Sequence, residues 1–265
     1  MDKKFSENPY NNNNKLITPK DIIDIMNKLN INDFIIDDII IYQNSFVHTS
    51  YTKLDDYKKY KNINNSLELQ DKSYETLEFL GDSILGSIVS SYLYRRYHET
   101  HKQNEGFLTK MKNNIVNGES LSMLSSSLNL NQFMIISKYI ELDCHGRDND
   151  NILEDIFEAL IGAIYLDKGY LMTERFILSV IETYIDFGEL IITDKNYKDQ
   201  LLRYYQNNYK ESPKYINVYN LQTKLFVTHL SNNKSIKEIF GFGKSKKKSE
   251  QDLANNVLID FGVLN

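Results

Sequence analysis

Two segments of the sequence carry acidic side chains inside runs that are otherwise apolar. In YETLEFLGDSILGSIVSSYLY, Glu75, Glu78 and Asp82 are spaced i, i+3 and i+7, which places them on one face of a helix. In NILEDIFEALIGAIYLD, Asp155 and Glu158 are one turn apart in a similar setting. Because ionised carboxylates are rarely buried without a partner, both segments are candidates for chemistry.

Most helical carboxylates are surface residues or members of i,i+4 ion pairs, and that is the alternative for these acids. However, no Lys or Arg lies within four residues of Glu78, Asp82, Asp155 or Glu158. Four converging unpaired acids destabilise a helical core unless a multivalent cation binds between them. Oxygen ligands without His or Cys favour Mg²⁺, for which Mn²⁺ can substitute, and this predicts phosphoryl transfer or phosphodiester hydrolysis.

The residues around these acids add two expectations. Gly86 follows Asp82 by one turn and Gly162 follows Glu158 by one turn, so helices or a sugar-phosphate backbone can approach closely there. We expect Glu154 to point off the acidic face and into solvent.

Apolar spacing predicts that the elements carrying the acids are all helical. A cap residue before a proline, Thr18-Pro19, predicts a helix start, and the polar residues 52–73 predict a long loop or partly ordered insertion. After Asp186 the pattern changes to helix, three short strands and helix within about 70 residues. The predicted helices of the body cover 22–29, 35–46, 74–97, 107–128, 152–166 and 172–184; the later helices cover 197–208 and 245–261, and the strands 215–219, 225–230 and 235–240.

The composition is that of a globular protein whose charge is unevenly distributed. The 265 residues carry a net charge of −5, but residues 196–265 hold 11 basic and 6 acidic side chains, which leaves −10 on the first 195. No apolar stretch approaches the roughly 18 residues of a membrane span, and the Asn-rich residues 1–17 lack the apolar region of a signal peptide and predict a disordered leader. A single cysteine, Cys144, excludes an intrachain disulfide and indicates a reducing compartment.

Four ordered blocks of the body resemble the ribonuclease III family. YETLEFLGDSIL is similar to the signature of that family, and NILEDIFEALIGAIYLD to its second acidic motif. FVHTSY at residues 46–51 and EGFLTKMKNNIV at residues 105–116 resemble the remaining blocks. The resemblance covers residues 18–186.

This resemblance implies an all-α endonuclease specific for double-stranded RNA that acts as a homodimer. By motif position, Glu78, Asp82, Asp155 and Glu158 are the metal-binding catalytic acids, and Glu75 and Glu105 are auxiliary acids. Phe79 corresponds to the dimer residue that enters a socket of the partner. Each protomer of such an enzyme cuts one strand and leaves 5′-phosphate and 3′-hydroxyl ends. For Glu105 the alternative is an ordinary acid favoured by the dipole at a helix start.

Residues 197–265 resemble a double-stranded RNA-binding domain, an α+β unit with the order α-β-β-β-α. YKDQLLRYYQ is similar to its first helix and GFGKSKKKSEQDLA to the entry of its second. A solvated lysine run is the alternative, but its place at a helix start favours phosphate binding. The predicted RNA-binding residues are Gln206, Lys244, Ser245, Lys246, Lys247 and Lys248.

Two positions depart from the pattern of the RNA-binding domain. Asn220-Leu221-Gln222-Thr223 replaces the usual Gly-Pro-x-His turn, and Arg203 occupies a position where glutamate is common. Groove contacts can therefore differ in detail.

The sequence thus predicts a Mg²⁺-dependent endonuclease of double-stranded RNA. The predicted domains are a leader (1–17), a nuclease domain (18–186), a linker (187–196) and an RNA-binding domain (197–265). Predicted partners are double-stranded RNA and a second copy of the chain, with no membrane, and the predicted location is intracellular, cytoplasmic or nuclear. One alternative is a catalytically silent protein that binds or sequesters double-stranded RNA, which retention of all four acids disfavours. Another is a metal phosphohydrolase acting on small molecules, which the basic module disfavours.

Overall fold

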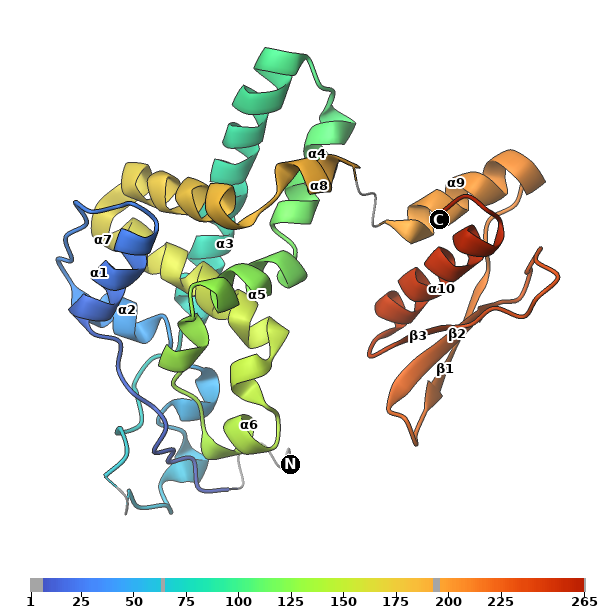
Figure 1. Cartoon of the computed structure of the whole chain (residues 1–265). Helices are drawn as coiled ribbons and strands as arrows, with labels where there is room; N and C mark the ends of the chain where they lie inside the picture. Colours follow the sequence, from blue (N-terminus) through green and yellow to red (C-terminus); the bar gives the residue numbers. More distant parts are fainter. Residues whose placement is uncertain (1–6, 63–64, 193–195, 265) are drawn as a thin grey trace. The chain divides into compact units, whose positions relative to one another are not determined.

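The computed structural model describes residues 7–62, 65–192 and 196–264 and divides the chain into two compact units, Met1–Phe187 and Gly188–Asn265. In the described residues the first unit is built from helices and short turns, with two isolated β-bridges in place of a sheet (Figure 1). Its helices are α1 (Pro19–Lys28), α2 (Ile39–Asn44), α3 (Glu75–Leu93), α4 (Glu105–Ile115), α5 (Gly118–Ser127), α6 (Lys138–Leu142) and α7 (Asp150–Tyr184), and α8 (Phe187–Ile192) begins at its end.

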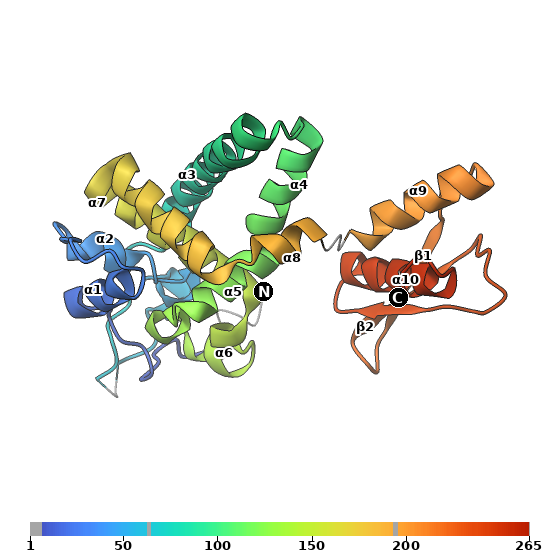
Figure 2. The same cartoon turned by 45° about the horizontal axis from the view of Figure 1, so that its top comes forward.

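The two acid-bearing helices, α3 and α7, pack directly against each other (Figures 1 and 2). A Cβ atom on Gly81 of α3 would lie 1.8 Å from the carbonyl oxygen of Glu158, and one on Gly162 of α7 would lie 2.3 Å from that of Leu77. The helix backbones therefore touch where these two glycines meet. The close approach expected at Gly162 is present, but its counterpart is Gly81, because Gly86 faces the side chain of Lys112 instead.

Helix boundaries differ from the prediction where polar caps or a glycine intervene. The region 107–128 is two helices, because the Asn117 side chain accepts a hydrogen bond from the backbone N–H of Ser120 (3.0 Å) and starts α5. The regions 152–166 and 172–184 are one helix, α7, bent at Gly169, whose φ of 72° is left-handed. Beyond α3, Tyr94–Glu99 continue as a π-helical turn.

The leader that the sequence predicts to be disordered is ordered over its described part, residues 7–17. Asn11 and Asn14 are buried, and both side-chain amides donate to the carbonyl oxygen of Ile136 (3.1 and 2.9 Å). Arg147 pairs with Glu141 and also donates to the side chain of Asn14. Side-chain amides can thus fix a polar segment through hydrogen bonds that apolar periodicity does not reveal.

The described residues of the polar insertion at 52–73 pack into a small apolar cluster that they share with neighbouring segments. Tyr51 and Tyr57 are buried in it together with Leu69, and Tyr51 donates a hydrogen bond to the carbonyl oxygen of Leu67 (2.7 Å). A bridge between Thr52 and Gln70 joins its two ends.

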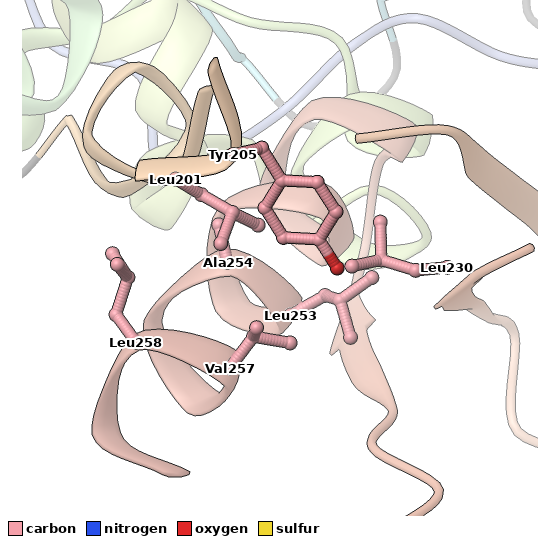
Figure 3. Close-up of a cluster of buried hydrophobic side chains, with 7 residues drawn as sticks. All are labelled: Leu201, Tyr205, Leu230, Leu253, Ala254, Val257 and Leu258. Carbon is pink, nitrogen blue, oxygen red and sulfur yellow. The ribbon is translucent and has the colours of Figure 1, made fainter. Parts of the chain in front are cut away.

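The second unit is an α+β fold, as predicted. It contains α9 (Tyr197–Tyr209), the antiparallel strands β1 (Tyr215–Asn220), β2 (Leu225–Leu230) and β3 (Gly241–Gly243) in that order, and α10 (Lys246–Asp260). Figure 3 shows the seven buried side chains of its core, from α9, β2 and α10: Leu201, Tyr205, Leu230, Leu253, Ala254, Val257 and Leu258.

The third strand is not at residues 235–240, where the sequence predicts it, but at Gly241–Gly243. A Cβ atom on Gly241 would lie 2.2 Å from the backbone nitrogen of Leu253, and one on Gly243 would lie 2.5 Å from that of Ser249. The strand must lack side chains at these positions so that α10 can pack onto it. This requirement outweighs the β-branched pattern that favoured the preceding residues.

Candidate active site

The crossing of α3 and α7 brings together the acids that the sequence singles out. Glu78 and Asp82 come from the first half of α3, and Asp155 and Glu158 from the first half of α7. Glu158 is buried with 8% of its surface exposed, Glu78 and Asp155 are partly buried, and Asp82 is exposed. The cluster therefore opens to solvent on the side of Asp82.

Burial and mutual repulsion disfavour the charged forms of these acids. Desolvation, followed by the charges of Asp82 and its neighbours, raises the pKa of Glu158 to about 8. Desolvation, followed by the charge of Asp155, raises the pKa of Glu78 to about 7. Within the described residues none of the four acids forms an ion pair. A cation that bound here would relieve a repulsion that the protein does not neutralise itself.

Tyr74, which the sequence analysis did not single out, positions one of the acids. Its hydroxyl donates a hydrogen bond of 2.7 Å to Asp155, and its ring packs edge-on against His48. The backbone N–H of Tyr74 donates to Val47 (2.8 Å), so the residue is held at both ends. Burial raises the pKa of Asp155 despite this hydrogen bond, which lowers it. In the sequence, the FVHTSY block, which supplies Val47 and His48, was the signal that could have indicated a role for Tyr74.

Glu154 does not point off into solvent as expected. It is partly buried, and a Cβ atom on Gly118 at the start of α5 would lie 2.4 Å from its carboxylate. Desolvation, and then the charges of Asp155 and Asp82, raise its pKa. Glu154 therefore adds a fifth carboxylate to the cluster, and helical spacing alone missed it because α5 confines the side chain.

A metal ion at this site would need several acids to move closer together. In the described ranges, no group of three or more His, Cys, Asp and Glu side chains is placed to hold one. The donor set nevertheless fits Mg²⁺, because Glu78, Asp82, Asp155 and Glu158 supply hard oxygens with no His or Cys among them. The mutual repulsion of these four acids also indicates a site for a cation.

Three other predicted residues of the first unit lie outside the group of four acids. Helix α4 begins beyond the end of α3 that is opposite to the acids (Figure 2), and its first residue, Glu105, accepts a hydrogen bond from Thr109 (2.8 Å). Within the first unit, the structure therefore does not bring Glu105 to the four acids. Glu75 is exposed on the first turn of α3, where its charge contributes to the raised pKa of Glu78. Phe79 lies on α3 between these acids and is 78% exposed.

The second unit presents its predicted RNA-binding residues to solvent. Ser245 caps α10 by accepting a hydrogen bond from the backbone N–H of Lys248 (3.2 Å). The side chains of Lys244, Lys246, Lys247 and Lys248 are exposed around this helix start, and Gln206 is exposed on α9.

The structure accounts locally for the two departures from the family pattern. Arg203 forms an ion pair with Asp199 one turn earlier (3.0 Å). In the β1–β2 turn, the Asn220 side chain accepts hydrogen bonds from the backbone N–H groups of Gln222 (2.9 Å) and Thr223 (3.1 Å), which leaves Leu221 83% exposed at the tip.

Comparison with known proteins agrees with this fold. Residues 38–185 match a family model described as Ribonuclease-III-like. The chain therefore belongs to the ribonuclease III family, whose members are endoribonucleases. In the described residues no helix is long and apolar enough to cross a membrane.

Individual relatives differ in how much of their length the chain spans. The chain is 37% identical over 272 residues to "Probable ribonuclease 3" of Acanthamoeba polyphaga mimivirus, an alignment that covers 97% of this chain but 46% of that protein. It is 32% identical to "Ribonuclease 3" of Leptospira interrogans over 82% of either chain. Among solved structures, the nuclease domain of ribonuclease III from Campylobacter jejuni matches with a TM-score of 0.50 and 25% identity, over 63% of this chain and 99% of that one.

Proposed function

We propose that this chain is a Mg²⁺-dependent endonuclease that hydrolyses phosphodiester bonds in double-stranded RNA. The observation that carries this proposal is Glu158, a buried carboxylate that faces Asp82, Glu78 and Asp155 and has no cationic partner in the described residues. Family membership supplies the reaction class. Because burying unpaired charge is costly, such a cluster is better explained as a cation site than as a structural feature.

In this proposal Glu78, Asp82, Asp155 and Glu158 hold the metal, with Mn²⁺ as a substitute. Mg²⁺ at such a site supplies positive charge that stabilises the charge developing on the phosphate. Tyr74 holds the Asp155 carboxylate in place through its hydrogen bond, so this ligand has little freedom to rotate away. Glu75 is an auxiliary acid on the exposed side, and Glu105 is a second one for which this unit shows no contact with the cluster. The products carry 5′-phosphate and 3′-hydroxyl ends.

We place a homodimer interface at the exposed side chain of Phe79. A large apolar side chain that is 78% exposed, next to the acids on α3, fits burial against a second copy of the chain. A two-fold interface also suits a duplex whose two scissile bonds are related by approximate two-fold symmetry. Each protomer would then cut one strand.

The second unit is proposed as the duplex-binding module. Its exposed lysines surround the N-terminus of α10, where free backbone N–H groups also attract phosphate. Gln206 and Ser245 complete the proposed contacts. Cys144 is a free thiol, which agrees with an intracellular site of action on RNA.

Cleavage of labelled duplex RNA tests the activity directly. The full chain should cut duplex but not single-stranded RNA with Mg²⁺ or Mn²⁺ and stop when EDTA removes the metal. Ca²⁺ should support binding without turnover, because its coordination is longer and looser. A protein that binds duplex with every cation but never cuts it would support the silent RNA-binding alternative.

The variant Glu158→Gln tests the site. It should abolish cleavage and leave duplex affinity nearly unchanged, because a metal ligand is lost while the lysines of the second unit remain. Glu119→Gln, which changes an exposed acid on the first turn of α5, is the control. Cleavage by Glu158→Gln at the rate of the unsubstituted protein would refute the assignment.

A further inference from the structure

A lysine from α4 lies against the acid-bearing helix at a position that the proposed metal site does not explain. A Cβ atom on Gly86 of α3 would lie 3.5 Å from Nζ of Lys112 and 3.9 Å from its Cε. The ammonium group therefore rests on the surface of α3, in space that the missing side chain leaves open. Lys112 is partly buried, unlike the exposed lysines of α10.

This contact is close to the acid cluster along α3. Gly86 follows Asp82 by four residues, so both lie on the same face of the helix, one turn apart. Asp82 is the exposed acid, on the side where the cluster opens to solvent. Lys112 thus places a positive charge beside the entrance of the site rather than within it.

Lys112 has no protein partner that would explain this placement. In the part of the chain that the structure describes, its side chain forms neither an ion pair nor a hydrogen bond, not even with Asp82. Most lysines extend into water or pair with a carboxylate when partly buried. A partly buried lysine without a carboxylate partner, at the edge of an anionic site, is suited to an anionic ligand.

The charge balance of the first unit indicates which ligand this is. Residues 1–187 carry 28 acidic and 19 basic side chains, so RNA phosphates are repelled except where a cation compensates. A metal at the cluster compensates at the reacting phosphate alone. The neighbouring phosphates of the same strand need a positive group nearby, and the Lys112 ammonium group lies at Gly86, one helical turn from Asp82.

We propose that Lys112 binds a phosphate adjacent to the scissile one and holds the RNA strand at the acid cluster. The inference rests on the proposed function and adds a substrate-contacting residue to it. Because an ammonium group is a point charge without the planar fork of arginine, this contact positions the backbone and reads no sequence.

Steady-state cleavage by the full chain separates this role from a purely structural one. Lys112→Ala should raise KM for duplex RNA about tenfold and change kcat much less, because a charge-assisted hydrogen bond to substrate is lost. Lys112→Arg should restore most of the loss. Alanine is the best helix former, so α4 should persist, and circular dichroism and thermal unfolding check this. Lys138→Ala, an exposed lysine on α6 of the same unit, is the control and should leave KM unchanged.

Binding without cleavage gives an independent readout. In a Glu158→Gln background with Ca²⁺, adding Lys112→Ala should lower the slope of log affinity against log salt by about 1, as expected for one lost phosphate contact. An unchanged KM and slope would overturn the proposal. If Lys112 serves only as a counter-charge to Asp82, the slope will stay constant and the pH dependence of cleavage will shift, which also overturns it. Failure of the unsubstituted protein to cleave duplex RNA would instead refute the proposed function, and the slope would still decide the role of Lys112.

Discussion

At the scale of single residues, Glu158 links the stability of the first unit to its proposed chemistry. Its carboxylate is buried and has no cationic partner in the described residues, so burial and neighbouring acids raise its pKa to about 8. Near neutral pH and without metal, Glu158 therefore holds a proton that a bound cation would have to displace. The acid spacing predicted the four residues, but it could not predict Tyr74, whose hydrogen bond to Asp155 depends on tertiary contacts with Val47 and His48.

We expect the metal-free protein to lose stability as pH rises from about 5 to 8. The raised pKa values of Glu158 (about 8) and Glu78 (about 7) mean that the folded state binds protons in this range that the unfolded chain has released. The free energy of unfolding must then fall with pH, and Mg²⁺ should oppose the fall by binding the ionised acids. Denaturant titrations in EDTA at several pH values measure how the free energy of unfolding changes with pH. Glu158→Gln should flatten the dependence, and an unaltered pH slope in that variant would contradict the assigned cause.

At the scale of elements, the contact between α3 and α7 depends on two glycines. Gly81 and Gly162 let the helix backbones touch, and this contact sets the spacing of acids that belong to different helices. The sequence predicted correctly that the regions carrying the acids are helical, because apolar periodicity records burial directly. It did not predict that Gly81 contacts α7. The glycine at the contact is set by the point where the two helices cross, and the sequence does not show that point. The wrong prediction of the third strand has a related cause. The position of β3 depends on glycines that let α10 pack against it, and local β-propensity does not reveal this packing.

Gly81→Ala should destabilise the first unit by at least about 2 kcal/mol, because its Cβ would lie 1.8 Å from the backbone of α7, which cannot yield locally. Gly86→Ala is the matched control on the same helix. Its Cβ would meet only the flexible end of Lys112, and the gain in helix propensity should raise stability by up to about 1 kcal/mol. Chemical denaturation compares the two. Equal stability of both variants would show that the helices do not touch at Gly81.

At the scale of the whole molecule, the two compact units have different proposed functions, cleavage in the first and duplex binding in the second. The net charge of −5 conceals −10 on residues 1–195 and +5 on the remainder. Composition showed this asymmetry at once, and the helix-strand order of the second unit was also predictable because its alternating strands are short and separated by clear turn residues. The ordered leader was not predictable, because buried asparagine amides leave no periodic signal.

Self-association should depend on Phe79. Phe79→Ala should weaken the proposed dimer by about 2 kcal/mol or more, as is typical when a buried aromatic anchor of an interface is truncated. Sedimentation velocity over a range of concentrations measures this, with Tyr94→Ala, also exposed but beyond the end of α3, as the control. A fully cleaving monomer at micromolar concentration would count against the interface.

Duplex affinity should depend on the lysines of the second unit in a salt-dependent way. Replacing Lys244, Lys246, Lys247 or Lys248 with Ala should each lower the slope of log affinity against log salt by about 1, because each lost phosphate contact releases fewer counterions. Lys210→Ala, an exposed lysine just after α9, is the control. If all four variants bind duplex like the unsubstituted chain at about 150 mM salt, where screening is already strong, this surface is not the RNA-binding one.

The order of synthesis on the ribosome separates the leader from the residues that bind it. Asn11 and Asn14 bind the carbonyl oxygen of Ile136, and Asn14 also meets Arg147, so their partners are synthesised more than 120 residues later. At roughly 5–20 residues per second, the leader waits several seconds outside the exit tunnel before its site exists. This segment is therefore synthesised well before the residues that bind it, and its polar, Asn-rich composition keeps it soluble in the meantime.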